Sequence, residues 1–198
     1  MVTNAERGRE VRQRLMAAAT ELVAERGWSA VSTRALAERA GVVPGVVHYH
    51  FPSVQALLRE ATVAAMRGLV DQLAAQVDQA ATPEDVLDLI LRGLERYTGV
   101  DPMSVLFVET YLAATRDKAL HDDVRGVLDT FRSGLARTLA ERGVATPGET
   151  AAVLAAAIDG VMLHRALDPG FDARAVAPVL RRMLVPAKTP SRVKRKGR

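Results

Sequence analysis

The side chains best suited to chemistry form one short cluster, His48, Tyr49 and His50. Two residues separated by one position lie about 200° apart around a helix, which disfavours a metal ion shared by the two histidines. Imidazole and phenol groups can instead donate hydrogen bonds to phosphate oxygens or base edges. The cluster therefore indicates a polar contact surface, and the alternative is a plain solvent-exposed helix end.

Motifs typical of enzymes are missing from the sequence. There is no Walker loop, no Gly-x-Gly-x-x-Gly, no His-Glu-x-x-His and no Gly-x-Ser-x-Gly. The one Ser-x-x-Lys, Ser191 to Lys194, falls in a charged tail and is incidental. The chain also has no cysteine, which removes thiolate nucleophiles and cysteine-ligated metal sites and fits a reducing cytoplasm. We therefore expect a cytoplasmic protein that is not an enzyme and needs no metal or cofactor.

Charge is distributed unevenly along the chain. Residues 1–52 carry a net charge of +2, residues 53–186 carry −4, and residues 187–198 carry +6. A basic N-terminal segment can approach nucleic-acid phosphates. The basic tail is expected to be disordered and solubilising, with a supplementary clamp on DNA as the alternative. These differences divide the chain into three parts: residues 1–52, residues 53–186 and the tail, 187–198.

The N-terminal and internal apolar segments predict neither a signal peptide nor a membrane span. Six charged side chains fall within the first fourteen residues, and no uncharged apolar stretch follows them. The longest smooth apolar stretch, 151–158, ends at Asp159, well short of the roughly 18–20 residues that a bilayer requires. We therefore expect no membrane partner.

Apolar residues recur at spacings of three and four almost throughout, which predicts an all-α fold of about nine helices. A first helix should end at Gly27, and a second should begin at Ser32 or Thr33 and end at Gly41. A short third helix should run from Pro44 to Phe51, and Ser53 should cap a long fourth helix that extends toward Ala80.

Two helices of about eight residues joined at Gly41 have the dimensions of a helix-turn-helix. Leu36, Ala37 and Val47 should pack against the first helix, which leaves the outer face of the third helix free for a DNA major groove. By spacing alone, a helical corner with no partner is nearly as good an interpretation, because such turns are common in helical proteins.

The residue types in this segment are more specific than the spacing of its helices. Residues 32–51, STRALAERAGVVPGVVHYHF, followed by PSVQALL, resemble the DNA-binding domain of the TetR family of repressors over about residues 10–60. The resemblance implies a DNA-binding domain over residues 1–52 and an effector-binding and dimerisation domain over residues 53–186. It also implies a homodimer that represses transcription and releases DNA when an effector enters the second domain. Three positions depart from the family pattern: Val43 replaces a capping Ser or Thr, His48 replaces a Tyr, and Val54 replaces a Lys that lies near a phosphate.

The third helix has no Arg, Lys, Asn or Gln between Val43 and Phe51, so direct base readout should be sparse. We expect Pro44 and Val46 to meet thymine methyl groups, His48 and Tyr49 to donate hydrogen bonds, and Arg34 to supply the main charged contact. DNA shape and the N-terminal arginines would add further specificity. The full expected DNA-binding set is Ser32, Thr33, Arg34, Val43, Pro44, Gly45, Val46, His48, Tyr49, His50 and Ser53.

Beyond Ala80 the pattern predicts one helix that begins at Pro83 and ends at Gly99. A helix with aromatic spacing, a long amphipathic helix to Gly143 and two C-terminal helices over 148–167 and 173–184 should follow. Aromatic and methionine side chains at helical spacing usually form core, but a ligand-responsive bundle needs a cavity for an apolar or aromatic molecule. The expected pocket set is Met103, Phe107, Glu109, Tyr111, Phe131, Met162 and Arg165.

Small and apolar residues on the last two predicted helices indicate a four-helix interface across a two-fold axis, and packing within a monomer is the alternative. The expected interface residues are Val153, Ala157, Gly160, Val161, Val176, Val179, Leu180 and Met183. The predicted function is a ligand-responsive repressor that binds a palindromic operator as a dimer. The alternative is a helical ligand-binding or scaffolding protein whose helix-turn-helix no longer binds DNA.

Overall fold

A computed structural model describes residues 3–184 and 186. This part of the chain folds into nine α-helices and two short 3₁₀ helices, which confirms the all-α prediction. In chain order the elements are α1 (Asn4–Arg26), η1 (Trp28–Ala30), α2 (Thr33–Ala40), α3 (Pro44–His50), α4 (Val54–Val77), α5 (Pro83–Leu94), α6 (Pro102–Ala114), α7 (Lys118–Glu141), α8 (Pro147–Leu167), η2 (Ala173–Val176) and α9 (Ala177–Arg181).

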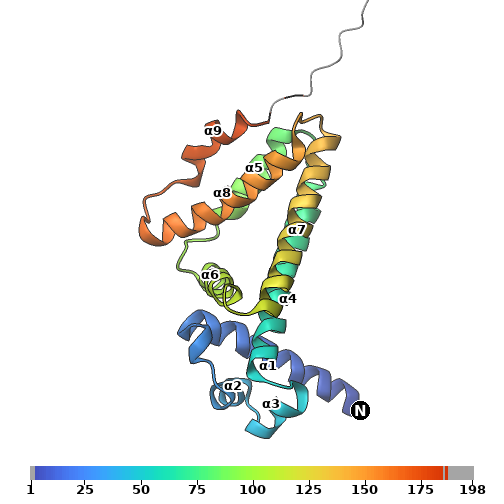
Figure 1. The fold of residues 1–198 in the computed structure, drawn as a ribbon, viewed down its shortest axis with the longest axis vertical. Helices are drawn as coiled ribbons and strands as arrows, with labels where there is room; N and C mark the ends of the chain where they lie inside the picture. Colours follow the sequence, from blue (N-terminus) through green and yellow to red (C-terminus); the bar gives the residue numbers. More distant parts are fainter. Residues whose placement is uncertain (1–2, 185, 187–198) are drawn as a thin grey trace, which may run out of the picture.

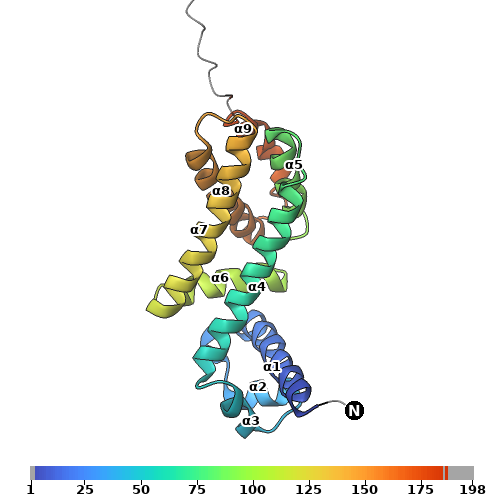
Figure 2. The same ribbon diagram turned by 90° about the vertical axis from the view of Figure 1, so that its right-hand side faces the viewer.

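The helices form two groups joined along α4. Helices α1, α2 and α3 lie at one end, and α5, α7, α8 and α9 lie at the other (Figure 1). Helix α4 begins beside α3 and runs into the second group, while α6 crosses the junction between them (Figure 2). One element is therefore shared by both ends of the molecule, and α6 touches both α1 and α7.

The N-terminal group has a core of fully buried apolar side chains. Leu15 and Leu22 of α1, Leu36 of α2, Val47 of α3 and Leu57 of α4 are all shielded from solvent. These positions come from the apolar stripe of each helix, so burying them fixes how the four helices pack.

The sequence signals for helix ends are confirmed around the helix-turn-helix. Ser32 caps α2 by accepting a hydrogen bond from the Ala35 amide, and Gly41 ends that helix in the left-handed conformation at φ 65°. A side chain at position 41 would be strained by that angle, which is why glycine suits the turn.

Gly99 does not end a helix, contrary to the sequence prediction. Helix α5 ends at Leu94, and Gly99 lies in the following loop with φ 85°. A Cβ atom there would lie 2.3 Å from the backbone nitrogen of Ala166, so the glycine allows the loop to touch α8. The predicted C-terminal helix is also shorter, because it divides into η2 and α9 and stops at Arg181.

Helix α8 is long and apolar enough to cross a membrane by length and composition alone, although it contains Asp159. The sequence prediction had excluded such a segment. In the structure α8 packs along α7 and also contacts α5.

Candidate DNA-binding surface and ligand cavity

Arg12 of α1 fixes the end of α3. Its guanidinium donates a hydrogen bond to the backbone oxygen of His50 at 3.1 Å and lies 4.2 Å from the centre of the Phe51 ring. The same group pairs with Glu60 of α4. Arg12 is one of the N-terminal arginines expected to contact DNA, but in the structure it joins α1, α3 and α4.

A second arginine is used in the same way. Arg39 of α2 forms ion pairs with Glu21 at 2.9 Å and Glu25 at 2.6 Å, both on α1. Because all three side chains are partly or fully exposed, these pairs orient α2 more than they stabilise it. By contrast, Arg34 at the start of α2 is exposed and forms no ion pair with any residue that the structure describes.

The predicted DNA-contact residues gather at the outer end of α2 and α3. The Thr33 hydroxyl lies 3.4 Å from Nε2 of His48, so the two helices present one continuous polar edge. Ser32 and Ser53 have their hydroxyl groups engaged as the caps of α2 and α4. Val43 caps nothing with its side chain, as the sequence predicted.

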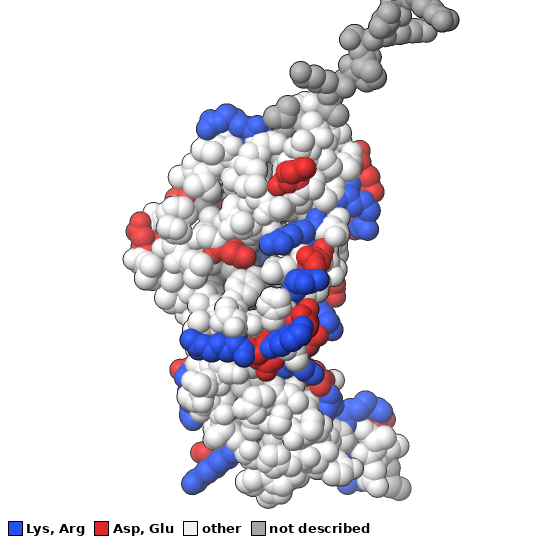
Figure 3. Space-filling model, viewed as in Figure 1, with Lys and Arg blue, Asp and Glu red and all other residues white. Residues whose placement is uncertain are grey.

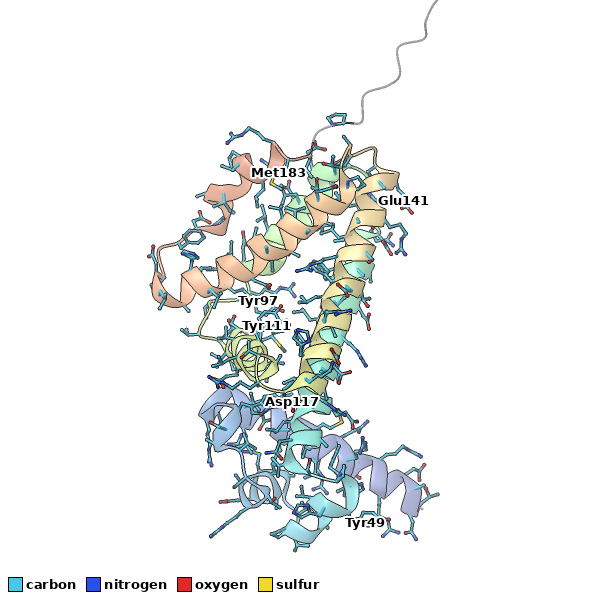
Figure 4. All side chains as sticks on the ribbon, in the orientation of Figure 1. Tyr49, Tyr97, Tyr111, Asp117, Glu141 and Met183 are labelled. Atoms are coloured by element: carbon cyan, nitrogen blue, oxygen red, sulfur yellow. The ribbon has the colours of Figure 1, made fainter. Side chains whose placement is uncertain are left out.

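The outer face of α3 is exposed and uncharged. Tyr49 is 84% exposed and projects from the far end of the molecule (Figure 4). Pro44, Gly45 and His48 are also exposed, whereas Val46 and His50 are half-buried. The face of this end turned to the viewer in Figure 3 is largely uncharged, with basic side chains at its margins. This surface can offer methyl contacts and hydrogen-bond donors, with cations only around it.

A contact that the sequence did not predict joins the two groups of helices. The carboxylate of Glu109, on α6, accepts a hydrogen bond from the backbone amide of Trp28 at 2.8 Å. The amide belongs to η1, directly after α1, and the neighbouring Gly27 leaves room for the carboxylate. Glu109 is therefore a link between α6 and the N-terminal group of helices.

A cavity of about 430 Å³ lies in the C-terminal group, between α4, α5, α6, α7 and α8. This volume falls within the range of small-molecule sites, and its walls are mainly apolar, as such sites require. Figure 4 shows Tyr97 and Tyr111 in the interior between α6 and α8. The aromatic members of the wall are Tyr97, Phe107, Tyr111 and Phe131.

Among the described residues that line the cavity, Asp159 of α8 is the one acidic side chain. The hydroxyl of Tyr111 donates to its carboxylate over 3.3 and 3.5 Å, which is long for a hydrogen bond between oxygens. Burial raises the pKa of Asp159, against the opposing effects of Tyr111 and the positive charge of Arg132. Burial and the Asp159 charge also raise the pKa of Tyr111.

The expected pocket set is divided by the structure. Phe107, Tyr111, Phe131 and Met162 line the cavity, whereas Met103, Glu109 and Arg165 do not. Met103 packs beside the N-terminal core, and Arg165 donates a hydrogen bond to the backbone oxygen of Leu94 at 2.9 Å. Tyr97 and Asp159 were missed. Asp159 interrupts an apolar run, and that interruption is the sequence signal that could have identified it.

The expected interface residues also separate into two kinds. Val153 and Val179 are 49% and 53% exposed, and Ala157, Gly160, Val176 and Met183 are half-buried. Val161 and Leu180 are buried in the core of their own chain. Leu163 and Leu167 of α8 are exposed as well, although they are not among the expected interface residues. The basic tail 187–198 lies outside the described residues.

No group of three or more His, Cys, Asp or Glu side chains within residues 3–184 is arranged to hold a metal ion. His48 and His50 lie on different sides of α3, one toward Thr33 and the other beside Tyr49.

Two family models match the chain. "Bacterial regulatory proteins, tetR family" matches residues 15–61, and "Tetracyclin repressor-like, C-terminal domain" matches residues 81–186. The chain is 31% identical to the HTH-type transcriptional regulator BetI of Rhizobium meliloti (strain 1021) over 162 residues, 79% of this chain and 78% of that protein. It is 33% identical to the HTH-type transcriptional repressor KstR of Mycolicibacterium smegmatis (strain ATCC 700084 / mc(2)155) over 99 residues, 48% of this chain and 47% of that one.

A solved structure has the same fold. It is described as a putative transcriptional regulator, SCO7518, from Streptomyces coelicolor A3(2), and it superposes with a TM-score of 0.76 at 29% identity. The match covers 89% of this chain and 99% of the other.

Proposed function

The chain belongs to the TetR family of bacterial transcriptional regulators, and we propose that it is a cytoplasmic repressor that binds a palindromic operator as a homodimer and is released by a small effector. The observation that carries this proposal is the continuity between the two sites. Helix α4 begins at the helix-turn-helix, and its Met66, Leu69 and Leu73 line the cavity.

Helix α6 supplies a second connection. Phe107 and Tyr111 of α6 line the cavity, and Glu109 between them binds the Trp28 amide on the other side of the helix. An effector that shifts α4 or α6 would therefore change how the helix-turn-helix is held. Such an effector favours the dimer conformation in which the two α3 helices no longer match major grooves about 34 Å apart.

The homodimer is proposed from the apolar outer face of α8 and α9. Val153, Leu163 and Val179 are exposed on these helices, and Leu167 is 89% exposed. A two-fold partner presenting the same face would bury all of them, which also accounts for the unusually apolar composition of α8. Dimerisation is required because one short recognition helix reads too few base pairs alone.

The effector is proposed to have an apolar or aromatic body. Apart from Asp159 and a few polar residues, the cavity is lined by aliphatic and aromatic side chains. These walls gain most by excluding water from an apolar ligand.

The proposal is tested by DNA selection from a random library, followed by a salt titration of the enriched fragment. A regulator should enrich a palindrome and bind it with an affinity that falls steeply as salt rises. A ligand-binding or scaffolding protein with an inactive helix-turn-helix, which the uncharged α3 face would suit, should enrich no sequence.

A further inference from the structure

Asp159 is a half-buried carboxylate without an adequate partner. Tyr111 reaches it only over 3.3 and 3.5 Å, and within the described residues no cation lies within 4.0 Å of it. An ionised carboxylate has about four acceptor sites, and here at most one is weakly filled. Its remaining acceptor sites are therefore available to a ligand in the cavity.

Such a group is costly when the cavity is empty. Removing a carboxylate from water destabilises its charged form unless a cation or several hydrogen bonds replace the water. Burial accordingly raises the pKa of Asp159. By contrast, the partly buried carboxylate of Asp101 accepts hydrogen bonds from the backbone amides of Thr98, Met103 and Ser104.

The walls around this carboxylate also suit a cation that carries an apolar body. Phe107 and Tyr111 meet edge to face with ring centres 6.4 Å apart, and Tyr97 and Phe131 complete the aromatic surface. Aromatic faces attract cations, and desolvation strengthens that attraction. Most of the rest of the wall is aliphatic, and it would contact the uncharged part of the ligand.

Three arginines could favour an anion instead. Arg92 and Arg96 lie on the cavity lining, and Arg132 acts on Asp159 from more than 4.0 Å away. All three are exposed, so water and salt screen their charges. Asp159 is the less screened charge because it is the more buried one.

We propose that the effector is a protonated primary or secondary amine on an apolar body, whose N–H group donates to Asp159. The inference rests on the proposed function in taking this cavity as the effector site. Charge-assisted N–H···O bonds are about twice as strong as neutral ones, which makes them selective. A quaternary ammonium ion has no N–H and would leave the carboxylate acceptors unfilled.

The test compares four probes by isothermal titration calorimetry with the full-length protein and no DNA: 4-phenylbutylamine, 4-phenylbutanol, 4-phenylbutanoate and trimethyl-(4-phenylbutyl)ammonium. The amine should bind about tenfold more tightly than the alcohol and more tightly than the other two. Asp159→Asn should remove the preference for the amine and leave binding of the alcohol unchanged. Asp129→Asn, which removes an exposed charge from α7, should retain the preference.

Equal affinity for amine and alcohol, a preference for the carboxylate, or no amine binding at millimolar concentration would overturn the proposal. An amine preference that survives Asp159→Asn would also overturn the proposal. A trimethylated probe that binds as tightly as the primary amine would overturn the N–H contact. Circular dichroism and alcohol binding report whether each variant is folded. Because no DNA is present, failure here leaves the operator proposal to be judged by its own experiment.

Discussion

The N-terminal group of helices and the C-terminal group differ in how completely their interiors are filled. Leu15, Leu36 and Val47 in the first are fully shielded from solvent, whereas the second encloses a cavity of about 430 Å³ and a carboxylate without a good partner. A packed interior holds one geometry, while a hollow one leaves stability to be gained by a ligand. We therefore assign DNA recognition to the packed, rigid N-terminal end and effector sensing to the hollow C-terminal end.

Operator binding requires first that the N-terminal ends of two protomers are held together. Val153→Asp places a charge in the proposed α8 interface, so the dimer should dissociate and DNA affinity should fall by more than about 100-fold. Analytical ultracentrifugation and fluorescence anisotropy measure the two effects. The matched control is Leu112→Asp on α6, since Leu112 is as exposed as Val153. A variant that remained dimeric would remove α8 from the interface.

Unequal packing should appear directly in stability. Leu36→Ala leaves a hole in the N-terminal core and should cost about 2–5 kcal/mol. Leu128→Ala, on the cavity wall, only enlarges an existing space and should cost less than about 1.5 kcal/mol. Urea unfolding of both variants gives the two values. Equal losses would mean that the C-terminal group is as tightly packed as the other.

At the rigid end, Arg34 is expected to be the main charged contact with DNA. Arg34→Ala should weaken operator binding by about 10- to 100-fold, because charged contacts of this kind contribute about 1–3 kcal/mol. Anisotropy at one fixed salt concentration measures the loss, with the exposed Arg116→Ala as the control. If His48→Ala abolished sequence preference while Arg34→Ala changed nothing, the ranking of these contacts would be reversed.

The link between the two ends is assigned to Glu109. Glu109→Gln keeps the shape but weakens the bond to the Trp28 amide, so effector binding and DNA binding should become less coupled by a few-fold. The ratio of operator affinities with and without effector reports the coupling. An unchanged ratio would leave α4 as the sole connection.

The smallest effect concerns Asp159 in the free protein. Its pKa is raised in the folded state, so the stability linked to its protonation is present below the unfolded value and is lost as pH rises through the folded value. Asp159→Asn avoids that loss and should stabilise the protein at neutral pH by about 1 kcal/mol or less, equivalent to roughly 2–4 °C. The gain should vanish at acidic pH. Calorimetry at two pH values checks it, and a less stable variant at neutral pH would contradict the unpaired carboxylate.

The difference between the N-terminal and C-terminal groups also explains how much of the structure could be predicted from the sequence. Ser32, Gly41 and Pro44 are local signals, because a cap, a left-handed turn and a helix start each depend on neighbours in the chain. The helix-turn-helix was therefore predictable with its boundaries. The structural role of Arg12 was not predictable, because its partners His50 and Glu60 lie far along the sequence.

The cavity depends on how five helices meet, and no local pattern specifies that. Phe107 and Tyr111 were predicted from their spacing, but Glu109 was assigned to the same pocket although residues two apart lie about 200° apart around a helix. That angle places Glu109 on the opposite face, toward Trp28. Asp159 could be noticed only as a break in an apolar run. That no cation of the described residues lies within 4.0 Å of it follows from the packing of α6, α7 and α8.

The proposal of an effector-released dimeric repressor is tested most directly by one anisotropy titration. The titration uses the selected palindromic fragment at physiological salt, with and without the effector. We expect two protomers to bind each fragment with a dissociation constant of about 10⁻⁸ M or tighter, and we expect the effector to weaken this binding at least tenfold. Binding by one protomer, or an affinity that no cavity ligand changes, would contradict it.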